Sequence, residues 1–210
     1  MTATTSDTLL RVLTARGDST AAGGIQIGSV LFVAALTAAA AQISVPLPFT
    51  AVPLTLQPMV VLVGALVLGS RLGAASQVLY LAAGIAGLPV FAASATLAPG
   101  ALRLLGPTGG YLMAYPLAAF VTGALAERGF DRRYHTSVLA MFAGLAIVFA
   151  GGVLWLGLFA RPLNGGAPAG LQSALATGLY PFLLADTIKL AIAAGFVPAL
   201  WRIVGRRGGR

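Results

Sequence analysis

Long apolar segments with very few charges dominate this chain and limit what it can fold into. Six apolar segments follow one another along the sequence: residues 25–43, 58–69, 72–91, 108–126, 137–160 and 173–204. Only 9% of all residues are charged, against roughly 25% in average soluble domains. Such a chain cannot cover itself with a water-soluble surface, which excludes an ordinary soluble enzyme and a disordered regulator. A membrane-spanning helix needs roughly 20 residues, so we expect an all-α polytopic membrane protein with six transmembrane helices.

The basic residues predict how these helices are oriented. In a six-span arrangement ten arginines fall on one side of the membrane, and only Arg103 and Arg161 fall on the other. Cytoplasmic segments carry the excess of Lys and Arg, so both termini are predicted to be cytoplasmic. The net charge of +8 then indicates contact with membrane lipid rather than with nucleic acid. The expected organisation is a cytoplasmic tail (residues 1–24), a six-helix transmembrane domain (25–204) and a basic cytoplasmic tail (205–210).

Residues 44–57, between the first two apolar segments, carry Pro46, Pro48 and Pro53. Each proline fixes φ and lacks an N–H, so this stretch is not expected to be helical. It is also too apolar for an ordinary solvated loop, and irregular backbone at membrane depth is tolerated only where protein or a cavity covers it. Two interpretations are open: an apolar cap folded against the helices, or an interfacial loop.

The last apolar segment is the only one of the six with charged residues in its interior. Asp186 and Lys189, the single lysine of the chain, are spaced i, i+3 and can pair on one helical face. A charge near the middle of the membrane costs about 2.5–3.5 kcal/mol on insertion scales, and a pair serving only packing could usually be replaced by apolar residues without loss. We therefore predict that the pair binds a small, partly apolar molecule. The alternative is that it only fixes helix packing.

The fourth apolar segment opens with the glycine-rich sequence GPTGGYL, which ends at Leu112. Gly109 and Gly110 permit close approach of the backbone, and a helix N-terminus offers free N–H groups to an anion. Tyr111 could stack on a ligand or donate to it. Arg103 lies just before this motif, where it either guides an anionic substrate or sits among lipid headgroups.

The first apolar segment carries two pairs of alanines at helical spacing, Ala34 with Ala38 and Ala35 with Ala39. Small residues one turn apart let another helix approach closely. They predict an interface with a partner protein, with packing inside the chain as the alternative.

Sequence motifs for enzymatic chemistry are absent. The chain has no cysteine, no Walker A, HExxH or GxSxG motif, and its one histidine, His135, stands in an arginine-rich connection. Nothing supports nucleotide hydrolysis or standard hydrolase chemistry, and neither a metal nor a resident cofactor is expected.

Taken in order, these motifs resemble the biotin-specific substrate-binding subunits (S components, BioY type) of energy-coupling-factor vitamin transporters. The similar pieces are AALTAAAAQI, VPLPFTAVPLTLQ, YLAAGIAGLPVF, GPTGGYLMAYPLAA and YPFLLADTIKLAIAA. The resemblance implies a six-helix S component in the cell membrane that encloses one biotin and assists its uptake. It implies ligand contacts for Asp186, Lys189, Tyr111, Thr55 and Gln57.

The connection AASATLAPGALRLL departs from the family pattern, being longer and poorer in glycine, and it adds Ser94 and Arg103 as candidate ligand contacts. The resemblance also implies partners, a transmembrane coupling protein and two ATPases, reached through the Ala34 and Ala38 strip. Whether the subunit works alone, as a homo-oligomer or with that module is left open.

Other functions are compatible with the same residues. A self-sufficient proton-coupled carrier could use Asp186 as its relay, and an S component could serve a different vitamin. A membrane enzyme or assembly factor is a third class, but an enzyme would need ionised groups converging from several spans, and only the last segment supplies them.

Overall fold

The computed structural model describes residues 8–14, 19–94, 97–160, 167–168 and 170–207. Helices make up most of it, and one short hairpin interrupts them. In chain order the elements are α1 (Leu9–Thr14), α2 (Ser19–Gln42), β1 (Ser44–Leu47), β2 (Thr50–Thr55), α3 (Gln57–Leu68), α4 (Ser70–Ile85), α5 (Leu102–Leu105), α6 (Gly109–Leu125), the π-helical turn η1 (Ala126–Phe130), α7 (Tyr134–Leu158), α8 (Leu171–Gly178), α9 (Tyr180–Ala193) and α10 (Phe196–Arg207).

Four stretches in the described part of the chain are long and apolar enough to cross a membrane. They are Thr20–Gln42, Gly109–Phe130, Tyr134–Leu158 and Tyr180–Ile203. The second expected span is the 12-residue helix α3, which at 1.5 Å per residue is about 18 Å long and too short to cross by itself. The third, α4, ends at Ile85 rather than at residue 91, because Gly87 has a positive φ of 95° and Pro89 follows.

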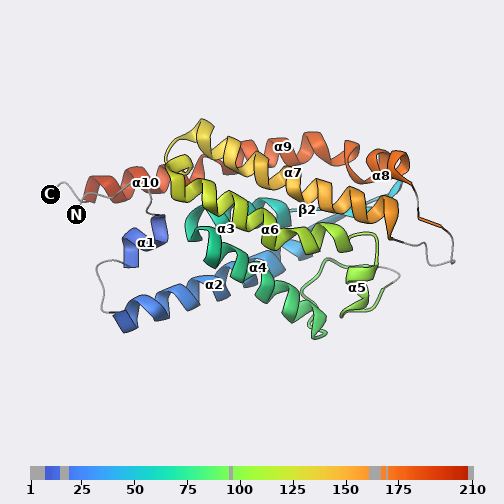
Figure 1. The fold of residues 1–210 in the computed structure, drawn as a ribbon, viewed down its shortest axis with the longest axis horizontal. Coiled ribbons are helices and arrows are strands. Elements are labelled where there is room, and N and C mark those ends of the chain that lie inside the picture. Colours follow the sequence, from blue (N-terminus) through green and yellow to red (C-terminus); the bar gives the residue numbers. More distant parts are fainter. Residues whose placement is uncertain (1–7, 15–18, 95–96, 161–166, 169, 208–210) are drawn as a thin grey trace.

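The sixth expected segment is not one helix. It is divided into α8, α9 and α10, with breaks at Leu179 and at Ala194–Gly195. α1 and α10 lie at the same end of the molecule, and α5 lies at the other (Figure 1). α1 falls within the expected N-terminal tail, while Arg16, Arg161 and Arg210 lie outside the described residues.

Residues 44–55 form a two-stranded antiparallel hairpin, so the expectation of an all-α fold is wrong at this point. The stretch is not helical, as its prolines predict, and extended backbone accommodates the fixed φ of proline. Ser44 pairs with Thr55 and Leu47 with Thr50, and the register is irregular between Val45 and Leu47, around Pro46. The cap interpretation fits this geometry, because Val52 is buried in the main hydrophobic core.

Glycines let the central helices pack with their backbones nearly touching. A Cβ on Gly110 of α6 would lie 2.2 Å from the Cβ of Trp155 and 2.3 Å from the carbonyl oxygen of Gly151, both on α7. Small residues at helix crossings allow such close approach in membrane proteins. α6 and α7 run side by side through the bundle (Figure 1), with α6 the most buried of the four long apolar helices.

The two alanine pairs of α2 face different surroundings. Ala34 is 7% exposed and belongs to the main hydrophobic core, and Ala38 packs against that core. Ala35 and Ala39, on a neighbouring face, are exposed. Ala34 therefore favours the alternative interpretation, packing inside the chain, and cannot contact a partner in this arrangement, whereas Ala38 is only partly buried. Ala35 and Ala39 stay candidates for such an interface.

The α6–α7 contact gives the first prediction. Gly110→Ala should lower the free energy of unfolding by about 1–3 kcal/mol, since the added methyl overfills a close-packed contact. Thermal unfolding in detergent measures this. Gly28→Ala is the matched control, because nothing lies within 4 Å of its added Cβ. Equal midpoint temperatures for the two variants would contradict the packing account.

Candidate functional site

A cavity of about 310 Å³ lies between the hairpin, the connection after α4, and helices α6, α7 and α9. That volume is at the lower end of the range of roughly 300–1,000 Å³ found for small-molecule sites. Its walls are mostly apolar, with Val148 and Phe149 from α7 and Phe182 from α9. A site of this size and polarity suits a small molecule with an apolar body.

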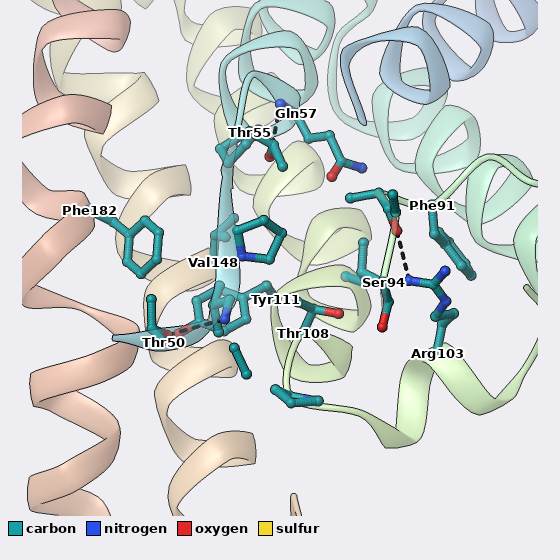
Figure 2. Close-up of a pocket in the computed structure, with 18 of the residues that line it drawn as sticks. Thr50, Thr55, Gln57, Phe91, Ser94, Arg103, Thr108, Tyr111, Val148 and Phe182 are labelled. Carbon is teal, nitrogen blue, oxygen red and sulfur yellow. Dashed lines mark hydrogen bonds between the residues drawn. The ribbon is translucent and has the colours of Figure 1, made fainter. Parts of the chain in front are cut away.

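Six of the seven residues predicted to bind a ligand line this cavity. These are Thr55, Gln57, Ser94, Arg103, Tyr111 and Asp186. Figure 2 shows Phe182 on one side of the cavity and Ser94 and Arg103 on the other. Segments far apart in the sequence therefore bring these predicted residues together, and their ligand contacts stay a prediction.

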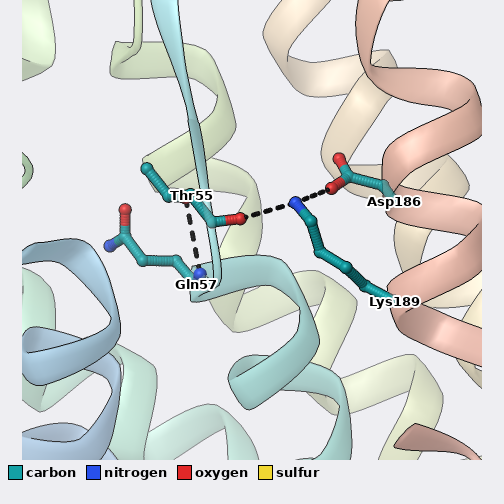
Figure 3. A network of polar contacts seen from close by, with 4 residues as sticks. All are labelled: Thr55, Gln57, Asp186 and Lys189. Atoms are coloured by element: carbon teal, nitrogen blue, oxygen red, sulfur yellow. Dashed lines mark hydrogen bonds and ion pairs between the residues drawn. The ribbon is translucent and has the colours of Figure 1, made fainter. Parts of the chain in front are cut away.

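Lys189, the seventh predicted residue, does not line this cavity. Its Nζ lies 2.7 Å from Oδ1 of Asp186 and donates a second hydrogen bond, of 2.9 Å, to the backbone carbonyl of Thr55 at the end of β2 (Figure 3). The predicted pairing of Asp186 with Lys189 is confirmed. The lysine also ties the hairpin to α9, a contact that the sequence does not reveal.

Within the described part of the chain, only one oxygen of the Asp186 carboxylate has a hydrogen-bond partner. Lys189 occupies Oδ1, and no hydrogen bond to Oδ2 occurs among the described residues. The aspartate is 7% exposed and lines the cavity. A carboxylate oxygen in such surroundings is a strong acceptor, because a buried acceptor without a partner is costly.

The Tyr111 hydroxyl is committed within the protein. It donates a 2.7 Å hydrogen bond to the carbonyl of Gly178 at the end of α8. A Cβ on Gly178 would lie 2.3 Å from that hydroxyl, and a Cβ on Gly152 would lie 2.1 Å from the tyrosine ring. The expectation that the hydroxyl donates to a ligand is therefore wrong for this geometry, whereas the ring still lines the cavity.

Arg103 is 9% exposed and is folded inward rather than into lipid headgroups. Its Nε donates to the carbonyl of Ala98 at 3.2 Å and its Nη1 to the carbonyl of Ala92 at 2.7 Å. Burial lowers the pKa of Arg103, yet an arginine starts so far above neutrality that it stays protonated. Both partners are neutral carbonyls, so a positive charge is available at the edge of the cavity.

The glycines of GPTGGYL serve packing rather than a ligand. A Cβ on Gly109 would collide with the carbonyl of Leu104 in α5, and Gly110 contacts α7 as described above. The indole N–H of Trp155 donates to the carbonyl of Gly106 at 3.0 Å. The motif thus fixes α5 and α6 around the cavity, where Pro107 and Thr108 form part of the wall.

Sequence reasoning missed most of the apolar lining, notably Tyr115, Phe91 and Phe182. A helical-spacing signal was present for two of them. Tyr115 follows Tyr111 by four residues and Phe182 precedes Asp186 by four, and residues at that spacing share one helical face. Among the described residues no group of three or more His, Asp or Glu side chains could hold a metal ion.

Long apolar helices around a partly open, mostly apolar cavity with polar groups at its edges are the features of a membrane protein that binds a small molecule. Residues 17–206 match the model of the BioY family. The chain belongs to the BioY family, and it is a multi-pass membrane protein.

Named relatives agree with this assignment. The chain is 38% identical over 168 residues to a protein of Pyrococcus horikoshii named "Probable biotin transporter BioY", covering 80% of this chain and 91% of that one. It is 39% identical over 160 residues to "Biotin transporter BioY" of Thermotoga maritima, covering 76% and 86%.

A solved structure has the same fold. It is the S-component for biotin from an ECF-type ABC transporter, with a TM-score of 0.70, 23% identity, and coverage of 89% of this chain and 95% of that one.

The Tyr111 contact gives the second prediction. Tyr111→Phe should lower the free energy of unfolding by about 1–3 kcal/mol, because the buried Gly178 carbonyl loses its donor. Thermal unfolding in detergent measures this. Tyr180→Phe is the matched control, since Tyr180 is 61% exposed. An unchanged midpoint temperature for Tyr111→Phe would show that the hydrogen bond from the Tyr111 hydroxyl to Gly178 does not stabilise the fold.

Proposed function

We propose that this chain is the biotin-binding S component of an uptake system in the cell membrane. The observation that carries the proposal is a cavity with apolar walls whose edges hold a carboxylate, Asp186, and a cation, Arg103. Relatives named as biotin transporters, at 38% and 39% identity, support biotin as the ligand. Neither catalysis nor a resident cofactor is part of this proposal.

The arrangement of polar and apolar groups in biotin matches that of the cavity. It has an apolar bicyclic body, a ureido group with two N–H donors and one carbonyl, and a carboxylate tail. The free oxygen of Asp186 suits a ureido N–H, and the guanidinium of Arg103 suits the carboxylate, since charge-assisted hydrogen bonds are the strong ones. The apolar body would lie between them, against Val148, Phe149 and Phe182.

Lys189 supports the site from behind Asp186. Its ammonium neutralises the carboxylate and holds the end of β2 through the Thr55 carbonyl. Two of its three donors are thus engaged, and because Lys189 does not line the cavity, it acts on the ligand through Asp186 and Thr55. Closure of the hairpin over the ligand would exclude water and strengthen each polar contact.

Six crossings with both termini in the cytoplasm remain our topology. Five arginines exposed to solvent or headgroups belong to the predicted cytoplasmic side: Arg11, Arg71, Arg128, Arg133 and Arg202. α1 and α10 lie at one end of the molecule, and α5, which carries Arg103, lies at the other (Figure 1). The cavity would then open toward the outside, with the hairpin completing the short crossing made by α3.

Energy for uptake would come from other proteins, because this sequence has no Walker A motif. An energy-coupling module with a transmembrane coupling protein and two ATPases fits the S-component fold. The exposed Ala35 and Ala39 face of α2 is our candidate contact for the coupling protein. The second candidate function is proton-coupled transport by this chain alone, which the buried Asp186 carboxylate favours.

The third prediction concerns the carboxylate end of the ligand. Detergent-solubilised protein should bind biotin about 10- to 100-fold more tightly than biotin methyl ester, which lacks the anionic group. Arg103→Gln should weaken biotin binding by about tenfold or more and leave binding of the ester nearly unchanged. Equilibrium binding of radiolabelled ligand, or calorimetry, measures both.

Arg128→Gln, at the opposite end of the bundle, is the control and should keep the preference for biotin. Equal losses for biotin and its ester in Arg103→Gln would reject the assigned contact. Retention of another vitamin in place of biotin would reject biotin as the ligand without affecting the fold.

The fourth prediction separates the two modes of transport. Proteoliposomes that contain this chain alone should accumulate no biotin under an imposed pH gradient, whereas addition of a cognate coupling module and ATP should drive uptake. Accumulation driven by the pH gradient, and abolished by Asp186→Asn, would establish the proton-coupled alternative.

A further inference from the structure

Tyr80 lies behind the cavity wall and does not line the cavity. It belongs to α4, is 1% exposed, and its ring packs edge-on against Phe91 at a centroid distance of 5.4 Å. Phe91 and Gln57 both line the cavity, and Tyr80 contacts both. The residue is therefore placed to act on the site through its neighbours.

The Tyr80 hydroxyl joins two walls of the cavity through one oxygen atom. It accepts a hydrogen bond from Nε2 of Gln57, the first residue of α3, and donates one of 3.2 Å to the backbone carbonyl of Val90. Gln57 is itself 3% exposed. The start of α3 and the segment after α4 are thus held by a single side chain.

The Val90 carbonyl determines which groups donate and which accept in this series of hydrogen bonds. The Val90 carbonyl can only accept, so the Tyr80 hydroxyl must use its one proton there. The hydroxyl can then only accept from Gln57, which requires the NH₂ group of the amide to face Tyr80. The amide oxygen of Gln57 is left on the other side, and no hydrogen bond to it occurs among the described residues.

From this geometry we infer that Tyr80 is a positioning residue that holds the Gln57 amide with its oxygen toward the ligand. The inference rests on the proposed function and deepens it. Gln57 Oε1 and Asp186 Oδ2 are then two hydrogen-bond acceptors in the cavity, and the ureido group of biotin carries two N–H donors. The site therefore selects a ligand that carries both donors. Tyr80 orients the acceptor for one of them, Gln57 Oε1.

The test uses the full chain in detergent with biotin and its two ureido N-methyl derivatives, each lacking one donor. The unmodified protein should bind each derivative about tenfold or more weakly than biotin, because a buried acceptor loses its partner. Tyr80→Phe keeps the ring and removes the hydroxyl, so the Gln57 amide can rotate. Discrimination against one derivative should fall at least about fivefold, and discrimination against the other, whose missing donor faces Asp186, should persist.

Two comparisons separate positioning from a general structural effect. Tyr134→Phe removes a hydroxyl that donates to the carbonyl of Ala191 at 2.9 Å, and Tyr134 does not line the cavity; this variant should keep both discrimination ratios. In a Gln57→Ala background, Tyr80→Phe should change the ratios by less than about twofold, since the two residues act as one unit.

A loss in Tyr80→Phe that is equal for biotin and both derivatives would overturn the inference, because it would show only a weakened fold. Full additivity with Gln57→Ala would overturn it as well. Failure of the unmodified chain to bind biotin would instead overturn the proposed function, and the positioning role with it.

Discussion

The ion pair between Asp186 and Lys189 is the interaction on which the rest of the site depends. An isolated charge in an apolar bundle is very costly, and it persists only with a partner and further hydrogen bonds. Here the 2.7 Å contact neutralises both charges, and the Thr55 carbonyl satisfies a second donor of the lysine. One pair thus fixes the carboxylate at the cavity and the hairpin above it.

Rigid helices surround the cavity, and irregular segments complete it. α6 and α7 meet through glycines, so Tyr111 and Val148 are placed by close-packed backbone. The hairpin and the connection after α4 contribute the remaining walls. Their backbone is secured by side chains: Arg103 holds the carbonyls of Ala92 and Ala98, and Tyr80 holds that of Val90. Non-helical backbone at this depth requires such internal partners.

Two features of the structure depend on residues close together in the sequence, and both could be predicted. The spacing of Asp186 and Lys189 predicted their pairing, and three prolines predicted that residues 44–57 are not helical. Strand pairing could not be predicted, because its register depends on contacts across the hairpin. The breaks at Leu179 and Gly195 lie beside helix-breaking residues, with Gly178 and Pro181 at the first and Pro198 after the second. These signals predict a probable boundary, but the apolar run was interpreted as one span.

Face-dependent and long-range contacts were equally inaccessible. α2 is apolar all round, so the pattern could not tell whether Ala34 or Ala35 faces inward. The partner of the Tyr111 hydroxyl, Gly178, is 67 positions away along the chain. The sequence around Arg103 allowed two interpretations, and its inward position depends on the fold of the connection.

The prolines of the hairpin have a consequence for where it can lie. An edge strand leaves N–H groups unpaired, and each must give up bound water when it enters an apolar environment. Pro46 and Pro53 have no N–H to dehydrate, and neither has Pro48 in the turn. A hairpin with so few unpaired donors lies against an apolar interior at a smaller desolvation cost than an ordinary two-stranded hairpin.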